Sequence, residues 1–233
     1  LEINNLRSRH FSKPRPVVGN FTAEYLKPNK YIKMTKKILT LFFLVSLNLI
    51  NAQDKPNDFL KNFNNELKIW KNTYSNFNLD EFEVEEKTNF KDLYSEKVPF
   101  KNLNQEYKTI GTYSPNKSKF IDIYSYLNLE KNGNSYDAIV DVDQNIVLYQ
   151  INENTKTTLL SCGSSKGIDE VFWVNEKKLL LVGTQYSEVK KPIIIIVDFE
   201  NSTVTEYANT NNNCTQKSKY NSPKLKLINI KGL

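Results

Sequence analysis

The chain has 233 residues, a formal net charge of +6, one histidine and two cysteines. His10 and every arginine precede Met34, so the chain beyond Met34 cannot build a histidine-dependent nucleophile, a histidine zinc site or a guanidinium fork for phosphate. The basic excess lies in residues 1–52, with nine Lys/Arg and two Asp/Glu, which leaves 23 Lys and 24 Asp/Glu in residues 53–233 and gives no support to a nucleic-acid partner.

Residues 34–52 have the layout of a secretory signal peptide. Lys36 and Lys37 form a positive start, residues 38–50 form an apolar core, and Ala52 is a small residue suited to cleavage. This core is shorter than the roughly 20 apolar residues that cross a bilayer. We therefore expect export to the periplasm or the extracellular space, with no stable membrane anchor once the signal is removed.

Residues 1–33 precede this signal, although signal peptides act at the N-terminus. Met34 is the only methionine, and the arginines and the histidine all lie before it. We therefore expect residues 1–33 to be a non-native upstream extension and residues 53–233 to form a single domain. A domain of about 180 residues can bury roughly 70% of its unfolded surface, which is enough for a real core.

The first element expected in that domain is an amphipathic helix over residues 57–77. Apolar and aromatic side chains recur there at spacings of three and four, which places them on one face. They are Phe59, Phe63, Leu67, Trp70, Tyr74 and Phe77. We expect the stripe to pack in the core, although such a stripe can also form a binding face. The acidic run that follows, residues 81–86, is expected to be a solvated face.

From Gly111 to residue 230 the pattern changes to short strands rich in β-branched and aromatic residues, separated by polar turns. The expected strands lie at residues 119–129, 135–142, 145–151, 155–162, 169–174, 177–185, 192–199, 202–208 and 224–230. In the last run, Lys224 and Lys226 alternate with apolar residues, as in edge strands that resist pairing with other sheets. The expected fold class is mainly β, an antiparallel meander of blade-like sheets with the amphipathic N-terminal helix packed on it.

A faint internal repeat supports the blade-like arrangement. "NIVLYQINENTKTTLL" at residues 145–160 resembles "IIIIVDFENSTVTEYA" at residues 193–208, and a related aromatic-turn-lysine-apolar unit precedes each, at residues 112–125 and 172–185. The pattern over residues 111–208 resembles the blades of WD40 and TolB β-propellers, in which a turn of the "SPDG" type precedes a strand. Two units do not close a ring of about four to eight blades. The resemblance therefore implies blade-like sheets, and an ordinary meander fits the same strands.

Cys162 and Cys214 are the only cysteines. In an exported protein a bridge between them would persist, and closing a loop of about 50 residues would contribute roughly 4 kcal/mol in the chain-entropy model. We expect this disulfide. Two separate thiols remain the alternative, because the sequence does not give the distance between the two Cα atoms.

No catalytic, cofactor-binding or metal-binding residue can be assigned. Asp141, Asp143 and Asn145 match the opening of an EF-hand loop, but its glycine and its final glutamate are missing. Ser114 and Lys117 match the S-x-x-K pair of penicillin-binding proteins, but a proline between them favours a turn and no "KTG" follows. Neither pattern predicts a site.

The excluded chemistries favour an exported protein that acts by non-catalytic binding of an unknown protein or glycan. Two alternatives remain. Carboxylate chemistry is open, which leaves a hydrolase of envelope polymers with two facing carboxyls roughly 5 to 9.5 Å apart. The second alternative is a periplasmic inhibitor of a cell-wall hydrolase. A cleft with two inward carboxyls would favour the enzyme, and an aromatic surface patch would favour binding.

Overall fold

The structure is a computed structural model that describes residues 56–91 and 93–231. The predicted upstream extension, residues 1–33, and the predicted signal peptide, residues 34–52, lie outside the described residues. Within the described part of the chain, no helix is long and apolar enough to cross a membrane. The residues from Asp54 onward belong to one unit, and its elements are mainly β-strands.

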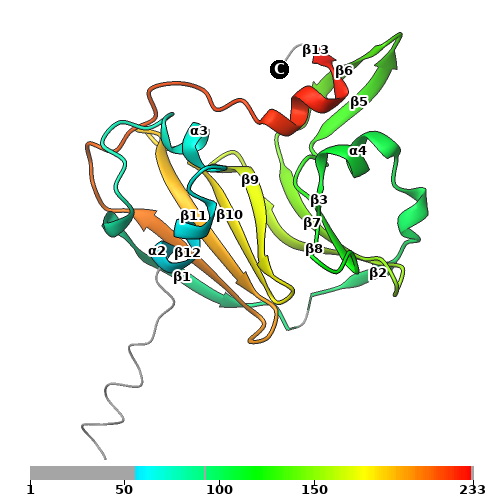
Figure 1. The fold of residues 1–233 in the computed structure, drawn as a ribbon, viewed down its shortest axis with the longest axis horizontal. Helices are drawn as coiled ribbons and strands as arrows, with labels where there is room; N and C mark the ends of the chain where they lie inside the picture. Colours follow the sequence, from blue (N-terminus) through cyan, green and yellow to red (C-terminus); the bar gives the residue numbers. More distant parts are fainter. Residues whose placement is uncertain (1–55, 92, 232–233) are drawn as a thin grey trace, which may run out of the picture. The chain divides into compact units, whose positions relative to one another are not determined.

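The described strands form three sheets, which Figure 1 shows. Sheet I has the order β2-β8-β7-β4-β3, with strands Ser95–Lys97, Thr155–Cys162, Gln144–Gln150, Lys119–Asp122 and Thr112–Tyr113. Sheet II has the order β1-β12-β11-β10-β9, with strands Phe82–Asn89, Thr203–Asn209, Lys191–Asp198, Lys178–Gln185 and Lys166–Asn175. Sheet III has the order β13-β6-β5, with strands Ile230–Lys231, Ser135–Val140 and Leu127–Asn132. Between β2 and β3 the chain forms η3, Phe100–Asn102, and α4, Gln105–Ile110.

The antiparallel hairpins expected from the sequence are confirmed. β7 pairs with β8, and β9, β10, β11 and β12 pair in succession, all antiparallel. Sheet I follows the same pattern, with the β5–β6 hairpin inserted between its neighbours β4 and β7. The resemblance to propeller blades stays a prediction.

The core lies on both faces of sheet II. In β11, Ile193, Ile195 and Val197 belong to one buried cluster, and Ile194 and Ile196 belong to another. The first cluster also contains side chains of sheet I, and the second contains side chains of the helical pieces at the start of the unit. Because both faces of β11 are covered, its sequence is a continuous apolar run instead of an alternating one.

The segment expected to form one helix over residues 57–77 forms shorter pieces in the structure. They are α2 at Pro56–Leu60, η1 at Lys61–Phe63 and α3 at Lys68–Lys71, and η2 follows at Leu79–Glu81. Asn62, Asn64 and Asn65 lie where the regular helix is interrupted. Asparagine has a low helix propensity, so three asparagines in four residues disfavour a continuous helix here.

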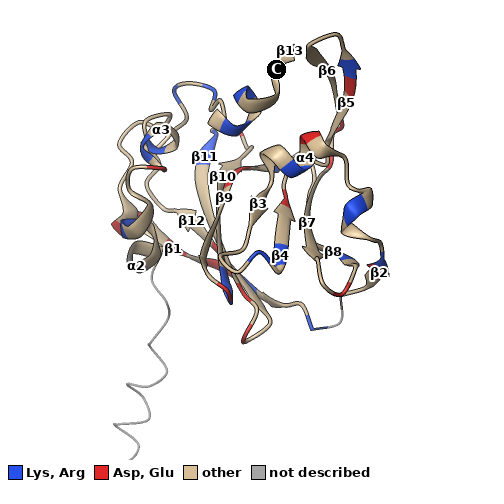
Figure 2. Ribbon diagram, turned by 45° about the vertical axis from the view of Figure 1, so that its right-hand side comes forward, with Lys and Arg blue, Asp and Glu red and all other residues tan. Residues whose placement is uncertain are grey.

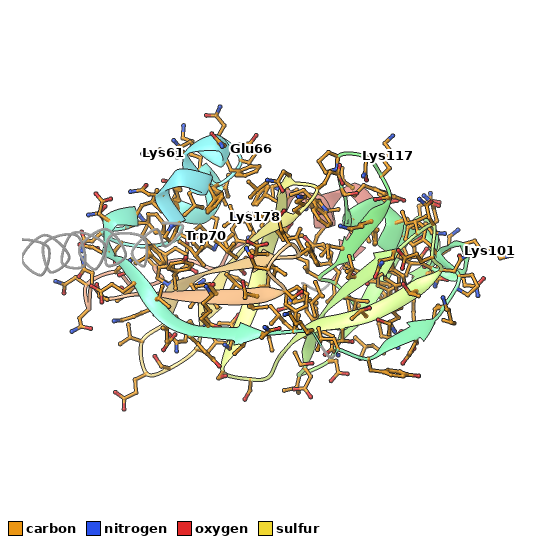
Figure 3. The ribbon with its side chains drawn as sticks, turned by 90° about the horizontal axis from the view of Figure 1, so that it is seen from below. Lys61, Glu66, Trp70, Lys101, Lys117 and Lys178 are labelled. Carbon is orange, nitrogen blue, oxygen red and sulfur yellow. The ribbon has the colours of Figure 1, made fainter. Side chains whose placement is uncertain are left out.

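The apolar stripe of this segment packs on sheet II. Leu60, Leu67 and Trp70 have no exposed surface. They share a cluster with Val182 of β10 and Ile194 of β11. Figure 3 shows Trp70 beneath the helical pieces, on the side that faces the sheet. Trp70 is therefore a core residue.

The acidic run at residues 81–86 lies mostly in β1, an edge strand of sheet II. The seven residues after Phe82 in this strand are exposed, so the expected solvated face is confirmed. The strand itself was not expected, although its backbone pairs with β12. Glutamate is depleted in strands, so the run carries little strand signal.

The strand expected over residues 224–230 is wrong. Pro223–Ile228 forms the 3-10 helix η4, and only the short strand β13 follows it. The Ser222 hydroxyl accepts a hydrogen bond from the backbone N–H of Lys224, and a proline in the first turn suits a helix start. Asn229, with a φ of 49°, ends this helix in the left-handed region.

The expected disulfide is wrong as well, because Cys162 and Cys214 are both free and buried. Cys162 ends β8 and belongs to the cluster between sheets I and II, whereas Cys214 belongs to the cluster on the other face of sheet II. Sheet II therefore separates the two sulfur atoms. Burial raises the pKa of both thiols to about 11, so both stay protonated at neutral pH.

Candidate functional site

A cavity of about 990 Å³ lies beside β9, the edge strand of sheet II. Residues 216–230, called the C-terminal segment below, form much of its wall. The remaining lining comes from Tyr126, Asp169, Tyr186 and Lys190. In Figure 1 the C-terminal segment runs past β9 into η4 and β13, so it joins sheet II to sheet III across this site.

Asp169 reaches the cavity because β9 is bulged. Val182 of β10 pairs with Glu170, and the next residue, Gly183, pairs with Ile168, which leaves Asp169 as an extra residue. A bulge of this kind bends the strand and re-aims a side chain. In a regular strand the two neighbouring acids would face opposite sides. Here Asp169 accepts from Trp70 and Glu170 accepts from Tyr220, and both of these partners belong to the cluster that contains the helical pieces.

One oxygen of Asp169 is held by the protein. Trp70 Nε1 donates to Oδ2 at 3.0 Å, and the Thr184 hydroxyl donates to the same oxygen at 3.1 Å. Among the described residues, none hydrogen-bonds to Oδ1. Burial raises the pKa of Asp169 to about 6, against the opposing effect of these two hydrogen bonds. Around that pH, Oδ1 can either donate a hydrogen bond to a ligand or accept one.

Glu170 lies next to Asp169 in the strand, but it is buried, with 4% of its surface exposed. The Tyr220 hydroxyl donates to its Oε1 at 2.9 Å, the Ser222 hydroxyl donates to the same oxygen, and Lys224 Nζ lies 3.3 Å from Oε2. All three partners belong to the C-terminal segment. Glu170 therefore fastens that wall of the cavity to β9.

Three tyrosines contribute to the lining, and Tyr220, whose hydroxyl is bonded to Glu170, is the most buried of them. Tyr186 keeps 41% of its surface exposed, and Lys190 Nζ lies 5.4 Å from the centre of its ring. Gly167 leaves room for this side chain, because a Cβ at that position would lie 2.9 Å from the Tyr186 hydroxyl oxygen. Burial, with a smaller contribution from Asp169, raises the pKa of Tyr126 to about 12. Its phenol therefore stays protonated and remains a hydrogen-bond donor at neutral pH.

Four lysines surround the cavity, namely Lys190, Lys217, Lys219 and Lys226. All four are exposed, and within the described ranges none of them forms an ion pair with a carboxylate. Figure 2 shows lysine positions along η4, close to the marked end of the chain. Asp169 is the one acid among the described lining residues, so the cavity carries an excess of positive charge.

The residues that the sequence offered for metal or acyl chemistry lie elsewhere. Asp141 and Asp143 are exposed in the connection between β6 and β7, and Asn145 lies in β7. Ser114 and Lys117 close the turn between β3 and β4, where the Lys117 N–H donates to the Ser114 carbonyl at 2.9 Å. None of the five belongs to the described lining of the cavity. No cluster of three or more potential metal ligands occurs among the residues that the structure describes.

Sequence reasoning missed Asp169, Glu170 and the lysines of the C-terminal segment. The available signal was "GIDEVFWV", in which two adjacent acids stand in an otherwise apolar strand. Acids in a buried strand need polar partners, so such a pair marks a place where the strand meets a polar site. The lysines of "QKSKY" carried no comparable signal, because solvated lysines are common on any surface.

No protein-family model matches the chain, and no curated protein or solved structure matches it significantly. The function is therefore inferred from the cavity itself.

Proposed function

We propose that the protein is an exported binding protein that holds a ligand in this cavity without transforming it. The observation that carries the proposal is the lining, which combines lysines without carboxylate partners, three tyrosine rings and one carboxyl oxygen that no described residue occupies. Open cavities of roughly 300 to 1,000 Å³ with a few convergent polar groups are typical ligand sites. The volume of about 990 Å³ lies within that range.

The carboxyls favour binding over hydrolysis. A carboxylate-dependent hydrolase of envelope polymers needs two carboxyls that face one substrate across roughly 5 to 9.5 Å. Both oxygens of Glu170 are occupied by Tyr220, Ser222 and Lys224, and Glu170 does not belong to the described lining. Asp169 alone is left to act on a ligand, which is sufficient for recognition.

The concave shape of the site favours a glycan or a small molecule over a protein partner. An inhibitor of a cell-wall hydrolase would use a protein–protein interface of about 800 Å² on each partner. Four exposed lysines and the exposed Tyr186 gather around a cavity instead. A cavity of this kind encloses a ligand, whereas an interface of that size needs a broad surface.

Export and the blade-like architecture are further parts of the proposal. The signal-like composition of residues 34–52 supports export. The neighbouring order of β3, β4, β7 and β8, and of β9 to β12, supports two blade-like sheets. Their shared buried cluster is consistent with two blades packed face to face.

Binding of the full chain to glycan and peptide arrays tests the proposal. Ser218 lies in the lining, so Ser218→Trp places a bulky side chain at the cavity, and Lys101→Trp is the control because Lys101 is exposed on η3 outside the lining. We expect the unaltered chain and Lys101→Trp to bind at least one ligand that Ser218→Trp no longer binds. Release of fragments from a bound glycan would support the hydrolase instead. Binding that Ser218→Trp leaves unchanged, or no binding at all, would contradict the proposal.

A further inference from the structure

We propose that the ligand of this cavity is an acidic saccharide, a short sugar chain that carries carboxylate, sulfate or phosphate groups. This inference rests on the proposed binding function and names the chemical class of its ligand. Three independent features of the lining point to this class: the lysines, the tyrosine rings and the free oxygen of Asp169.

The lysines point to an anionic ligand. Some lysines of the described chain are held in ion pairs, such as Lys166 with Glu206 and Lys177 with Glu200, whereas others, such as Lys61 and Lys101, are exposed singly on the surface without one. The four cavity lysines have no such partner among the described residues, although residues 53–233 contain 24 acids for 23 lysines. Positive charge gathered in a concave site attracts anions and raises their local concentration. An anionic group of the ligand would supply the missing partner.

The tyrosines point to a ligand with a ring or another apolar face. Tyr126 and Tyr186 both belong to the lining, and Tyr186 is the more exposed of the two. Aromatic side chains combine an apolar ring with a polar hydroxyl, and sugars likewise combine apolar C–H faces with hydroxyls. A simple inorganic anion would leave these rings unused. A cavity of about 990 Å³ also exceeds what a single phosphate or sulfate needs.

Asp169 points to a ligand that has hydroxyls as well as negative charge. A polyanion without hydroxyls could contact the lysines, but it would be repelled by this carboxyl once the carboxyl ionises and could not donate a hydrogen bond to it. A sugar hydroxyl can donate to the free Oδ1, while Trp70 and Thr184 hold Oδ2 and fix the carboxyl in place. The carboxyl would therefore orient the sugar, and the lysines would hold its charged substituents.

Tryptophan fluorescence of the full chain tests the inference, because Trp70 is bonded to the carboxyl in question. Trp173→Phe leaves Trp70 as the only tryptophan of the chain. The probes are a galacturonic acid trimer, a galactose trimer as the uncharged match, a sulfated heparin tetrasaccharide, mannose 6-phosphate and inorganic phosphate. We expect at least one acidic saccharide to change the Trp70 emission with saturation, at concentrations about tenfold or more below those of the galactose trimer and of phosphate.

Paired variants separate the lysines from general charge effects. Lys217→Gln with Lys219→Gln removes two cavity lysines, and Lys61→Gln with Lys101→Gln removes two exposed lysines outside the lining, both labelled in Figure 3. We expect the cavity pair to weaken binding of the acidic saccharide about tenfold and the control pair to change it less than twofold. Raising the salt concentration should weaken binding of the acidic saccharide to the unaltered chain, and it should reduce the difference in affinity between the unaltered chain and the cavity variant.

The outcomes separate this inference from the proposed function. Equal binding of the galacturonic acid and galactose trimers, or equal losses in the two lysine pairs, would overturn the acidic ligand and leave the binding function intact. Phosphate that binds as tightly as the acidic saccharides would show a simple anion site and overturn the saccharide. If the array ligands that Ser218→Trp no longer binds include no acidic saccharide, the acidic saccharide is likewise overturned and the binding function stays. Failure of the arrays as well would remove both proposals.

Discussion

Trp70 Nε1 donates a 3.0 Å hydrogen bond to Asp169 Oδ2, across 99 residues of sequence. The tryptophan is fully buried under the helical pieces, and the aspartate lines the cavity. The Thr184 hydroxyl shares the same acceptor oxygen and also hydrogen-bonds Tyr74. The helical pieces therefore do more than cover sheet II, since one of their core residues holds a carboxyl that lines the cavity.

Replacing Trp70 by phenylalanine should destabilise the protein in a pH-dependent way. The variant keeps most of the packing but removes a donor to a carboxyl whose pKa is about 6, so the pKa of Asp169 should rise further. At pH 7 the lost bond is charge-assisted, and we expect the unfolding free energy to fall by about 2 to 3 kcal/mol. At pH 4.5, where Asp169 is protonated, the loss should be smaller. Urea unfolding at both pH values measures this.

Trp173→Phe is the control for that experiment. Trp173 Nε1 donates to the carbonyl of Thr112 at 3.3 Å, and this acceptor does not titrate. The loss of unfolding free energy in Trp173→Phe should therefore be the same at both pH values. A Trp70→Phe cost that is equally independent of pH would contradict the role of Trp70 at Asp169.

Removing the cation beside Glu170 should be strongly destabilising. Lys224→Met leaves a carboxylate with 5% side-chain exposure and only hydroxyl partners, and we expect a loss of about 3 to 5 kcal/mol. Adding Glu170→Gln should recover part of that loss, because the uncharged amide no longer needs the cation. Lys177→Met provides the comparison, since its pair with Glu200 has side chains 62% and 57% exposed. Urea unfolding of the unaltered chain, the two single variants and the double variant measures these losses. A loss of unfolding free energy in Lys224→Met that is no larger than in Lys177→Met would contradict the importance of the buried pair.

A second buried carboxyl, Asp122, should make stability depend on pH. Burial raises its pKa to about 6 from an ordinary value of 3.8, despite a hydrogen bond from the Tyr124 N–H. The folded state therefore binds this proton more tightly than the unfolded state does. The unfolding free energy should fall as the pH rises from about 4 to about 6, by at most about 3 kcal/mol for this group.

Asp122→Asn should remove this contribution while keeping an acceptor for the Tyr124 N–H. The difference between the unaltered chain and the variant should change across that pH window and stay constant above it. Denaturant unfolding from pH 4 to pH 8 provides the test. Parallel profiles for the two proteins would show that Asp122 does not titrate as described.

The cysteines should behave as two protected thiols. Both are free and buried with pKa values of about 11, so thiol reagents should label neither in the folded protein at pH 7. Denatured, unreduced protein should yield two thiols per chain. A reductant should leave the melting temperature unchanged. Denatured protein without titratable thiols would mean that the cysteines are bridged.

The strand pattern could be predicted from the sequence because it depends on local chemistry. "IIIIVDF" and "KKLLLVGTQ" are apolar runs bounded by polar turns, and they became β11 and β10. β1 was missed because its pairing with β12 joins segments more than 100 residues apart, and its exposed acids give no strand pattern. In "SPKLKLINI" the alternation favoured a strand, but the Ser222 cap and Pro223 start a helix.

The cavity could not be predicted, because it depends on contacts between distant parts of the chain. Asp169 reaches the cavity only through a bulge, and bulges have no reliable sequence signature in a single chain. The predicted disulfide was wrong for a related reason. Cys162 and Cys214 satisfy the composition argument, but the three-dimensional position of sheet II keeps them apart.

Backbone NMR of the full chain, titrated with the galacturonic acid trimer, tests most directly whether this cavity is the binding site. We predict that the amide shifts concentrate at Tyr126, Asp169, Tyr186 and residues 216–226, and that Ser218→Trp abolishes them. Shifts that concentrate on the exposed apolar residues Ile139, Val140 and Val142, at the end of β6 and just after it, or that persist in Ser218→Trp, would contradict the account.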